Sequence, residues 1–373
     1  MRRSEFDIAV VGGGIVGAAI AFGAAGSGRR IVMLDEGDVA LRASRGNFAL
    51  VWVHGKGLGR PDYARWSARA VRRWRGFADD LAGETGTDVG LEQRGGLLLF
   101  LDEEGLTTQA AACRRIADDL GADAFPVEAL DHAATARLLP AIGPEVAGAT
   151  FCPLDGHVNV LRLFGALHEG CRRRGVDYRP GAKVAAISRE PGGGYRLDTA
   201  AGTVAAARVV LAAGLGNARL APMLGLSAPV LPERGQILVT ERTGRLLDYP
   251  TGTVRQTDEG SVMIGASKER VGFDTGTETE VLAELAASAV RMFPALASLA
   301  VVRSWGALRV MTPDGLPIYA VDPSGTAFLA TCHSGITLAS VHAGEIAAAV
   351  AGGPLPDVFA QFSPERFADV QAA

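Results

Sequence analysis

The chain has 373 residues, of which 48% are hydrophobic and 21% are charged. This length predicts roughly two domains, and the apolar content suffices for a large core without disulfides or metals. The formal net charge of −4 gives no reason to expect a nucleic acid or an anionic membrane as the main partner. No CxxC pair and no zinc spacing occur, so we expect no metal site, no iron–sulfur cluster, and reduced, buried thiols at the four cysteines Cys113, Cys152, Cys171 and Cys332.

The N-terminus carries a pattern that could be mistaken for a secretion signal. Arg2 and Arg3 precede an uncharged run over residues 8–28, as in a twin-arginine signal. Glu5 and Asp7 stand at the start of the apolar stretch, where a signal peptide would avoid them. We therefore interpret this region as the first βαβ unit of a cytoplasmic protein. No other segment is long and apolar enough to span a membrane.

Residues 7–17 read as an apolar strand, a glycine turn and the start of a helix. Gly12 permits the tight turn, Gly14 lets the backbone approach a pyrophosphate, and Gly17 lets the helix pack against the strand. The helix N-terminus offers free N–H groups and a partial positive charge to the phosphates. A second apolar run ends at Asp35, where a ribose-binding acid is expected. The pattern predicts a dinucleotide held by Gly12, Gly14, Ile15, Val16, Gly17, Asp35 and Glu36.

Hydrophobic periodicity divides the rest of the chain into alternating helices and strands. Helices are expected over residues 62–82, 103–120, 127–139, 160–174, 279–292 and 337–351. Strands are expected over 95–101, 183–187, 195–199, 203–204, 207–214 and 327–331, and residues 226–270 are strand-rich. This order predicts a parallel α/β sheet built from pieces near the start, the middle and the end, with a strand-rich second domain inserted in two segments. Ligands of such sheets lie at the carboxyl ends of the strands.

Several segments together resemble one family, the FAD-dependent amine and D-amino-acid oxidoreductases, which include glycine oxidase, sarcosine oxidase and the flavin subunits of opine oxidases. The resemblance covers nearly the whole chain. Asn47-Phe48 and the segment 51–57 look most similar to the opine oxidase and D-hydroxyproline dehydrogenase branch. The other segments that carry it are the N-terminal fingerprint, Ala43-Ser44, and residues 209–214, 306–309, 312–317 and 333–339.

The resemblance implies a Rossmann-type FAD-binding domain over residues 1–90, 151–225 and 305–373, and an α+β substrate-binding domain over residues 91–150 and 226–304. Only one GxGxxG pattern is present, so a second pyridine-nucleotide site is not visible. Further contacts to FAD are implied for Ser44, Asn47, Val184, Ala213, Gly214, Gly306, His333, Gly335, Ile336 and Thr337. The last three open the final helix, whose partial positive charge would stabilise the reduced flavin.

Some relatives attach the flavin covalently through a cysteine just before the segment that corresponds to Thr312–Pro317. The stretch here is Arg309-Val310-Met311-Thr312, which contains no cysteine. We therefore expect the FAD to be bound non-covalently.

The activity that the resemblance implies is oxidation of a Cα–N bond in an amino acid, an N-substituted amino acid or an opine-like compound. Hydride passes from Cα to flavin N5, and water hydrolyses the resulting imine to a 2-oxo acid and an amine. Arg309 matches the arginine of the family's Gly-x-x-Arg segment, and a guanidinium can pair with both oxygens of a substrate carboxylate. His54 and Lys56 follow the flavin-contacting loop and are candidates to border the substrate. Arg255 is a candidate for a second cation, which a dicarboxylate opine would need.

Two other functions stay open from the sequence. One is oxidation of a hydroxy acid or glycerol phosphate on the same scaffold, although the cations of the inserted domain are scattered. The other is a non-catalytic FAD subunit that relays electrons within a heteromer; the presence of Arg309 argues against a dead pocket. The direct electron acceptor is also open between oxygen, a quinone and a partner subunit, and the opine-like branch favours a partner subunit.

Overall fold

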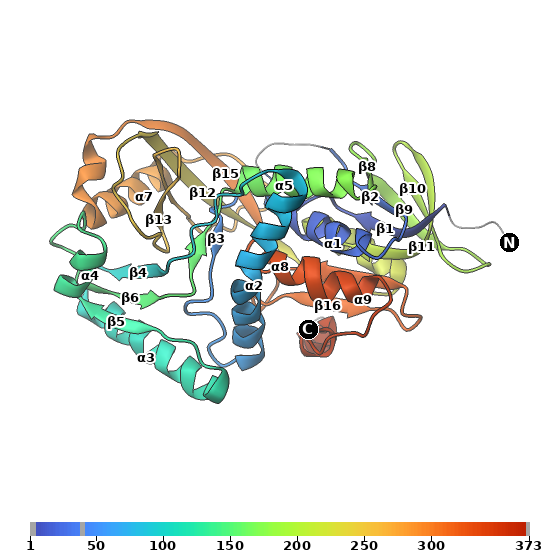
Figure 1. The fold of residues 1–373 in the computed structure, drawn as a ribbon, viewed down its shortest axis with the longest axis horizontal. Helices are drawn as coiled ribbons and strands as arrows, with labels where there is room; N and C mark the ends of the chain where they lie inside the picture. Colours follow the sequence, from blue (N-terminus) through green and yellow to red (C-terminus); the bar gives the residue numbers. More distant parts are fainter. Residues whose placement is uncertain (1–4, 38–41, 371–373) are drawn as a thin grey trace.

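The computed structural model describes residues 5–37 and 42–370. Residues 1–4, 38–41 and 371–373 lie outside this description, and so do Arg2 and Arg3 of the signal-like pattern. Two lobes lie side by side along the long axis of the molecule (Figure 1). The chain passes between them several times, so each lobe is assembled from segments that are distant in sequence.

The first lobe is built on a sheet whose central strands are parallel. Its main path runs in the order β16-β17-β11-β1-β2-β8. Off this path, β10 pairs with β11, and β9 pairs with β10. The strands are β1 (Phe6–Val11), β2 (Ile31–Leu34), β8 (Asp177–Arg179), β9 (Val184–Arg189), β10 (Tyr195–Thr199), β11 (Gly202–Leu211), β16 (Ile318–Val321) and β17 (Ala327–Thr331). Segments from the start, middle and end of the chain meet in this sheet, which confirms the predicted fold class.

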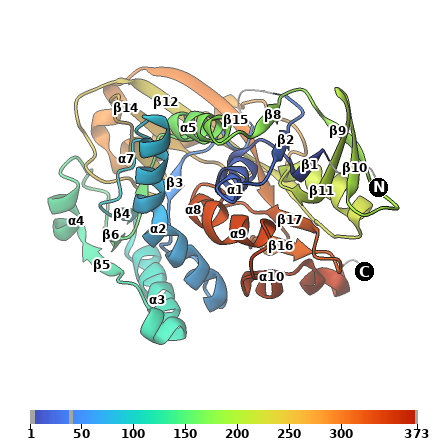
Figure 2. The same cartoon turned by 45° about the vertical axis from the view of Figure 1, so that its right-hand side comes forward.

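Helices cover one face of this sheet (Figures 1 and 2). They are α1 (Ile15–Ala25), α5 (Val160–Arg173), and a C-terminal run of α8 (Ala339–Val341), a π-helical turn (His342–Ile346) and α9 (Ala347–Val350). Helix α1 is buried on nearly all sides, and it packs so closely that a Cβ at Gly23 would come within 1.9 Å of the Ala343 carbonyl oxygen. The opposite face packs against α6 (Asn217–Leu220) and the turn that follows it, and apolar side chains of β9 and β10, which belong to the same sheet, join this second core.

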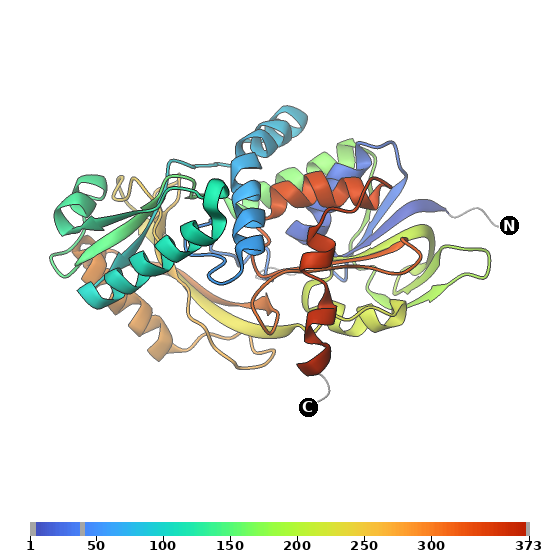
Figure 3. The ribbon, with the colours of Figure 1, turned by 90° about the horizontal axis from the view of Figure 1, so that it is seen from below.

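The second lobe contains two antiparallel sheets. One has the order β13-β14-β12-β15 and the other the order β4-β6-β5. Helix α2 (Pro61–Thr85) lies between the lobes (Figure 3), and so does β3 (Leu50–Val51), which is labelled in Figure 1 and pairs with β7 (Gly156–His157). The lobe's strands are β4 (Gly96–Phe100), β5 (Glu128–Asp131), β6 (Gly148–Cys152), β12 (Leu231–Arg242), β13 (Val254–Gln256), β14 (Ser261–Gly265) and β15 (Val301–Met311), and its helices are α3 (Glu103–Leu120), α4 (His132–Leu138) and α7 (Thr279–Met292).

One predicted helix needs correction. Residues 127–139 were expected to form one helix, but residues 128–131 form β5 and only His132–Leu138 are helical. The Asp131 carboxylate accepts a hydrogen bond from the Ala134 amide at 2.7 Å, which caps the helix and fixes its start after Asp131. The preceding residues pair with β6 instead.

The predicted boundary between residues 304 and 305 falls inside β15, which pairs with β12 as one strand from Val301 to Met311. The division into two domains therefore stays a prediction. None of the helices in the described ranges combines the length and apolar character that a membrane crossing requires. Within those same residues, no cluster of three or more His, Cys, Asp and Glu side chains is arranged to hold a metal ion.

The loop over residues 266–278 is fastened to β12 by one arginine. The Arg234 side chain is fully buried and forms ion pairs with Glu269, Asp274 and Glu278. The backbones of Arg234 and Glu269 also exchange two hydrogen bonds, at 2.9 and 3.0 Å. A guanidinium suits this position because its five N–H groups can serve several carboxylates at once.

We expect Gly17→Ala to destabilise the protein strongly. A Cβ at this position would lie 1.9 Å from the Gly12 carbonyl oxygen, so α1 would have to move away from β1. The loss in the free energy of unfolding should be about 3 kcal/mol or more, as for other severe core clashes. Gly165→Ala is the matched control, because that helical glycine has no atom within 4 Å of its added Cβ. Thermal unfolding of the two variants measures the difference; equal melting temperatures would contradict the packing described here.

Arg234→Met should lower the free energy of unfolding by about 2–3 kcal/mol, because it leaves three carboxylates close together without their cation. The exposed Arg303 on the neighbouring β15 offers a control, and Arg303→Met should change stability by less than about 0.5 kcal/mol. Urea unfolding of both variants tests this. If Arg234→Met proves as stable as Arg303→Met, the ion pairs contribute nothing net.

Candidate functional site

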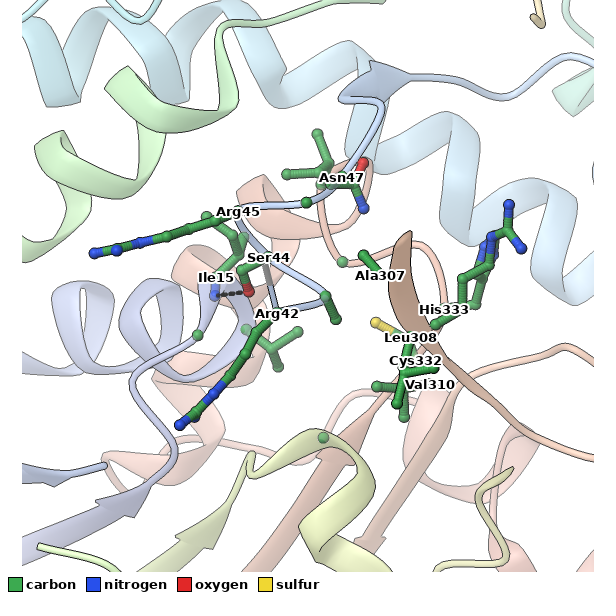
Figure 4. A pocket seen from close by; sticks show the side chains of 18 of the residues that line it. Ile15, Arg42, Ser44, Arg45, Asn47, Ala307, Leu308, Val310, Cys332 and His333 are labelled. Atoms are coloured by element: carbon green, nitrogen blue, oxygen red, sulfur yellow. Dashed lines mark hydrogen bonds between the residues drawn. The ribbon is translucent and has the colours of Figure 1, made fainter. Parts of the chain in front are cut away.

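A cavity of about 1020 Å³ lies at the carboxyl ends of the parallel strands and extends to the second lobe. Its walls come from the glycine turn with residues 42–48, from the C-terminal segment 330–337, and from β12, β15 and the loop 266–275. Figure 4 shows Ile15, Ser44 and Arg42 on one side of it and Cys332, His333 and Val310 on the other. This volume is at the upper end for small-molecule sites and leaves room for a dinucleotide together with a second ligand.

The glycine turn has the geometry of a phosphate cradle. Gly12 has a φ of +111°, and a Cβ there would lie 2.4 Å from the Ala212 carbonyl oxygen. The Ser44 hydroxyl accepts a hydrogen bond from the Ile15 amide at 3.0 Å (Figure 4). The Asp35 carboxylate accepts one from the Gly13 amide at 2.7 Å. The turn therefore directs the N-terminus of α1 into the cavity, where an anion is stabilised.

Two arginines lie at this end of the cavity. The Arg42 guanidinium is 3.4 Å from the carboxylates of both Asp35 and Glu36. The Arg45 guanidinium lies 4.5 Å above the centre of the Phe164 ring, and both residues line the cavity. Positive charge beside a helix N-terminus suits a diphosphate.

Arg309 lies at the other end, on β15, and its guanidinium rests on the backbone of Gly235. A Cβ at Gly235 would come within 2.5 Å of Arg309 Nη2, so only glycine fits under the guanidinium. Arg309 donates to Glu233 at 3.0 Å, to the Arg234 carbonyl at 3.3 Å and to the Ser267 carbonyl at 2.7 Å. Three of the five guanidinium N–H groups are thereby engaged, and the other two can receive a carboxylate.

His333 lines the cavity among cations. Burial lowers its pKa to about 4, and the nearby charges of Lys56, Arg309 and Lys268 act in the same direction. The imidazole is therefore neutral at physiological pH. Next to it, burial raises the pKa of the Cys332 thiol to about 12, so this cavity-lining cysteine is not a thiolate.

The cavity brings most of the predicted site residues together. Arg309 lines it with fifteen of the seventeen residues predicted to bind the cofactor: Gly12, Gly14, Ile15, Val16, Asp35, Glu36, Ser44, Asn47, Ala213, Gly214, Gly306, His333, Gly335, Ile336 and Thr337. Their roles toward a cofactor remain predictions.

Four predicted or candidate residues do not line the cavity. Gly17 packs beneath Gly12 instead. Val184 is buried, and its carbonyl accepts a hydrogen bond from Arg219 at 2.6 Å. His54 is buried with Nδ1 3.5 Å from the Asp155 carboxylate, so its side chain does not reach the space that Arg309 faces. Arg255 is also buried, with a guanidinium N–H group directed at His157 Nδ1, 3.1 Å away.

The sequence reasoning missed several residues of the site. Glu233 and Gly235 face Arg309 only because β12 pairs with β15 in a register that sets Glu233 opposite Arg309. Gly13, Arg42 and Arg45 are adjacent to the motifs that we singled out, so proximity in sequence was the available signal. Lys268 is one of the scattered cations of the inserted domain and was not assigned to the site, since its loop reaches the cavity through the ion pairs of Arg234.

The chain matches the FAD dependent oxidoreductase family, DAO, over residues 7–349. It is 47% identical over 371 residues to the opine oxidase subunit designated B of Agrobacterium tumefaciens (strain Ach5), covering 99% of each chain. It is 44% identical over 372 residues to the corresponding opine oxidase subunit of Rhizobium meliloti, also covering 99% of each chain.

The fold is similar to that of glycine oxidase from Geobacillus kaustophilus, with a TM-score of 0.88, 27% identity, and 97% and 98% of the two chains covered. The glycine cradle, the acid at the end of β2 and the roomy cavity are what a flavin dinucleotide requires. Together with the match over most of its length, they identify the chain as a member of the DAO family of FAD-dependent oxidoreductases.

Proposed function

We propose that the protein oxidises a Cα–N bond of an amino acid or N-substituted amino acid. The observation that carries this proposal is Arg309, a cation with two unused N–H groups in the same cavity as the dinucleotide cradle. A guanidinium in this state binds a carboxylate in a fixed orientation. The carboxylate is common to all amino-acid substrates, whereas a simple alcohol or amine lacks it.

The chain's own residues would hold FAD along the cavity. The N-terminus of α1 and the arginines at positions 42 and 45 would face the diphosphate, and Asp35 would face the ribose. When bound, FAD supplies the acceptor for a hydride from the substrate Cα. No cysteine occurs at residues 309–312, which supports non-covalent binding.

The reaction balances without a protein nucleophile. The amine loses a proton, Cα loses a hydride, and the nitrogen lone pair forms the C=N bond of an imine. Water then adds to the imine carbon, and the C–N bond breaks to give a 2-oxo acid and an amine. The protein's part is to fix the substrate's orientation through Arg309 and to keep the reacting carbon in the cavity.

The names of the relatives support this substrate class and a multi-subunit enzyme. The similar curated proteins are named as subunits of an opine oxidase, and the similar structure is a glycine oxidase. We propose that electrons leave the flavin to a partner subunit. We also propose a cytoplasmic location, in keeping with the free thiols of all four cysteines.

Asp35→Ala should weaken FAD binding by about tenfold to a hundredfold, because it removes both the predicted ribose contact and the acceptor of the Gly13 amide. Titration of the deflavinated protein with FAD, followed by quenching of flavin fluorescence, measures the affinity. Asp198→Ala, on β10, removes an equal charge from a half-exposed side chain that does not line the cavity, and it should leave the affinity unchanged. Equal affinities of the two variants would contradict the assigned FAD site.

Anaerobic mixing of the FAD-loaded protein with its substrate should bleach the flavin absorbance at about 450 nm. The panel comprises D-amino acids, sarcosine, prolines, hydroxyprolines and opines, with 2-hydroxy acids and glycerol phosphate as the competing class. Bleaching only by the competing class would overturn the proposal. Admission of air then distinguishes an oxidase, which reoxidises rapidly, from the expected subunit, which does not.

Arg309→Gln should weaken substrate binding in this reduction by about a hundredfold, because it removes the positive charge and the paired N–H groups that would hold a carboxylate. Arg270→Gln is the control: it removes the same charge from an exposed position on the neighbouring loop that does not line the cavity. A concentration series of substrate in the anaerobic assay yields both affinities. An unchanged affinity for Arg309→Gln would remove Arg309 from the substrate site.

A further inference from the structure

Lys56 lies on the loop after β3, and its ammonium group lines the cavity where this loop meets the segment that precedes the C-terminal helical run. Its Nζ donates to the Ser334 hydroxyl at 2.9 Å and to the Thr337 hydroxyl at 3.3 Å. Ser334 is in turn 3.0 Å from the Tyr63 hydroxyl. Both acceptors of the ammonium are neutral, and Nζ has a third N–H group to donate.

No carboxylate in residues 5–37 or 42–370 forms an ion pair with Lys56 Nζ within 4.0 Å. The nearby Asp155 lies beyond ion-pair distance of Lys56: its Oδ1 accepts hydrogen bonds from the Val53 and His54 amides at 2.7 and 3.3 Å, and its Oδ2 lies 3.5 Å from His54 Nδ1. Burial lowers the pKa of Lys56 to about 8 because it disfavours the charged ammonium, and the charge of Asp155 opposes this shift. An anion that enters the cavity would favour the charged ammonium further.

The charges at this end of the cavity are unbalanced. Lys56, Lys268 and Arg309 line it, and Glu233, which is paired with Arg309 at 3.0 Å, is the acid among the lining residues there. A ligand with one carboxylate bound to Arg309 leaves positive charge uncompensated. A ligand with two carboxylates places one negative charge at Arg309 and the other at Lys56.

We propose that Lys56 binds a second carboxylate of the substrate, so that the cavity selects secondary amines that carry a carboxyl group on each side of the nitrogen. This inference rests on the proposed function and assigns Lys56 as its specificity-determining residue. Arg309 lies on β15 of the second lobe, Lys56 lies on the loop that joins β3 and α2 between the lobes, and the charges of both act on His333. A dicarboxylate would therefore lie past a neutral imidazole, with one end at Arg309 and the other at Lys56.

The products follow from this substrate class. Oxidation of one Cα–N bond, then addition of water, converts a dicarboxylic secondary amine into an amino acid and a 2-oxo acid. Each product keeps one carboxylate, so neither can occupy both cations at once. Both products should therefore bind more weakly than the substrate, which favours their release.

Binding of non-oxidisable thioethers tests the assignment. Thiodiacetate has two carboxylates around sulfur, and (methylthio)acetate has one. Each is titrated into the FAD-loaded protein, and the change in the flavin spectrum reports binding. We expect thiodiacetate to bind at least about tenfold more tightly than (methylthio)acetate, and Lys56→Gln to bring this ratio near one without changing the affinity for (methylthio)acetate.

Lys268→Gln is the matched control, because it removes one positive charge from an exposed residue of the same cavity. It should weaken thiodiacetate much less than Lys56→Gln does, as expected for long-range attraction alone. Lys56→Arg, which keeps the charge, should retain a preference for thiodiacetate. This rescue separates loss of the charge from a folding defect.

The preference should also depend on pH. Lys56 is charged below its pKa of about 8 and neutral above it, so the thiodiacetate preference is full at pH 7 and declines as pH rises past about 8. A bound carboxylate raises the pKa of the ammonium, which moves the decline to somewhat higher pH. Binding of (methylthio)acetate to Arg309 should not change over this range.

Two outcomes would overturn the inference. One is an unchanged ratio in Lys56→Gln. The other is equal weakening of both thioethers together with a shift in the flavin reduction potential, which would place the ammonium at the flavin rather than at the substrate. Failure of both thioethers to bind the unmodified protein would instead count against the proposed function itself, while intact binding with an unchanged ratio leaves that function standing.

Discussion

The cavity depends on the buried guanidinium of Arg234. Through its three carboxylate partners it fixes the loop 266–278 against β12. That loop supplies the Ser267 carbonyl that holds Arg309, and the carbonyl of Arg234 itself holds Arg309 from the other side. Arg234, which does not line the cavity, therefore sets the direction of the Arg309 guanidinium, which does. A charge in this position is stable only while all of its partners stay in place, which explains why the loop keeps its place although much of it is exposed.

The two ends of the cavity differ in how far the sequence alone could predict them. The cradle end is encoded locally, because Gly12, Gly14 and Gly17 lie within six residues of sequence, and a Cβ at Gly12 or Gly17 would meet backbone atoms at 2.4 or 1.9 Å. Arg309 could be predicted because its segment resembles a family pattern. The partners of Arg309 could not, since Glu233 and Gly235 approach it through a strand register set by residues more than seventy positions away.

The division of the predicted helix, and the different positions of His54 and Lys56, have physical causes of the same kind. The periodicity of residues 127–139 suits a helix, but an open strand edge on β6 and the capping carboxylate of Asp131 divide the segment. His54 and Lys56 are two residues apart on one loop, and nothing local distinguishes them. The His54 side chain lies in the interior, 3.5 Å from the fully buried Asp155 carboxylate, while the Lys56 ammonium donates to the hydroxyls of Ser334 and Thr337 at the cavity. Contacts with residues that are distant in sequence, rather than the loop sequence itself, decide that Lys56 and not His54 lines the cavity.

The close approach of Gly12 to Ala212 has a consequence for when the protein can fold during its synthesis. The cradle is complete only when β11 has paired with β1. The other edge of β11 pairs with β17, whose residues are 327–331. Helix α1 is apolar on nearly all sides and finds its last neighbours in the C-terminal helical run. During synthesis the first βαβ unit therefore keeps apolar surface exposed until β17 and the helical run 339–350 have left the ribosome. Such long-range pairing folds slowly and exposes the nascent chain to aggregation, so we expect cofactor capture to be a late, post-translational event.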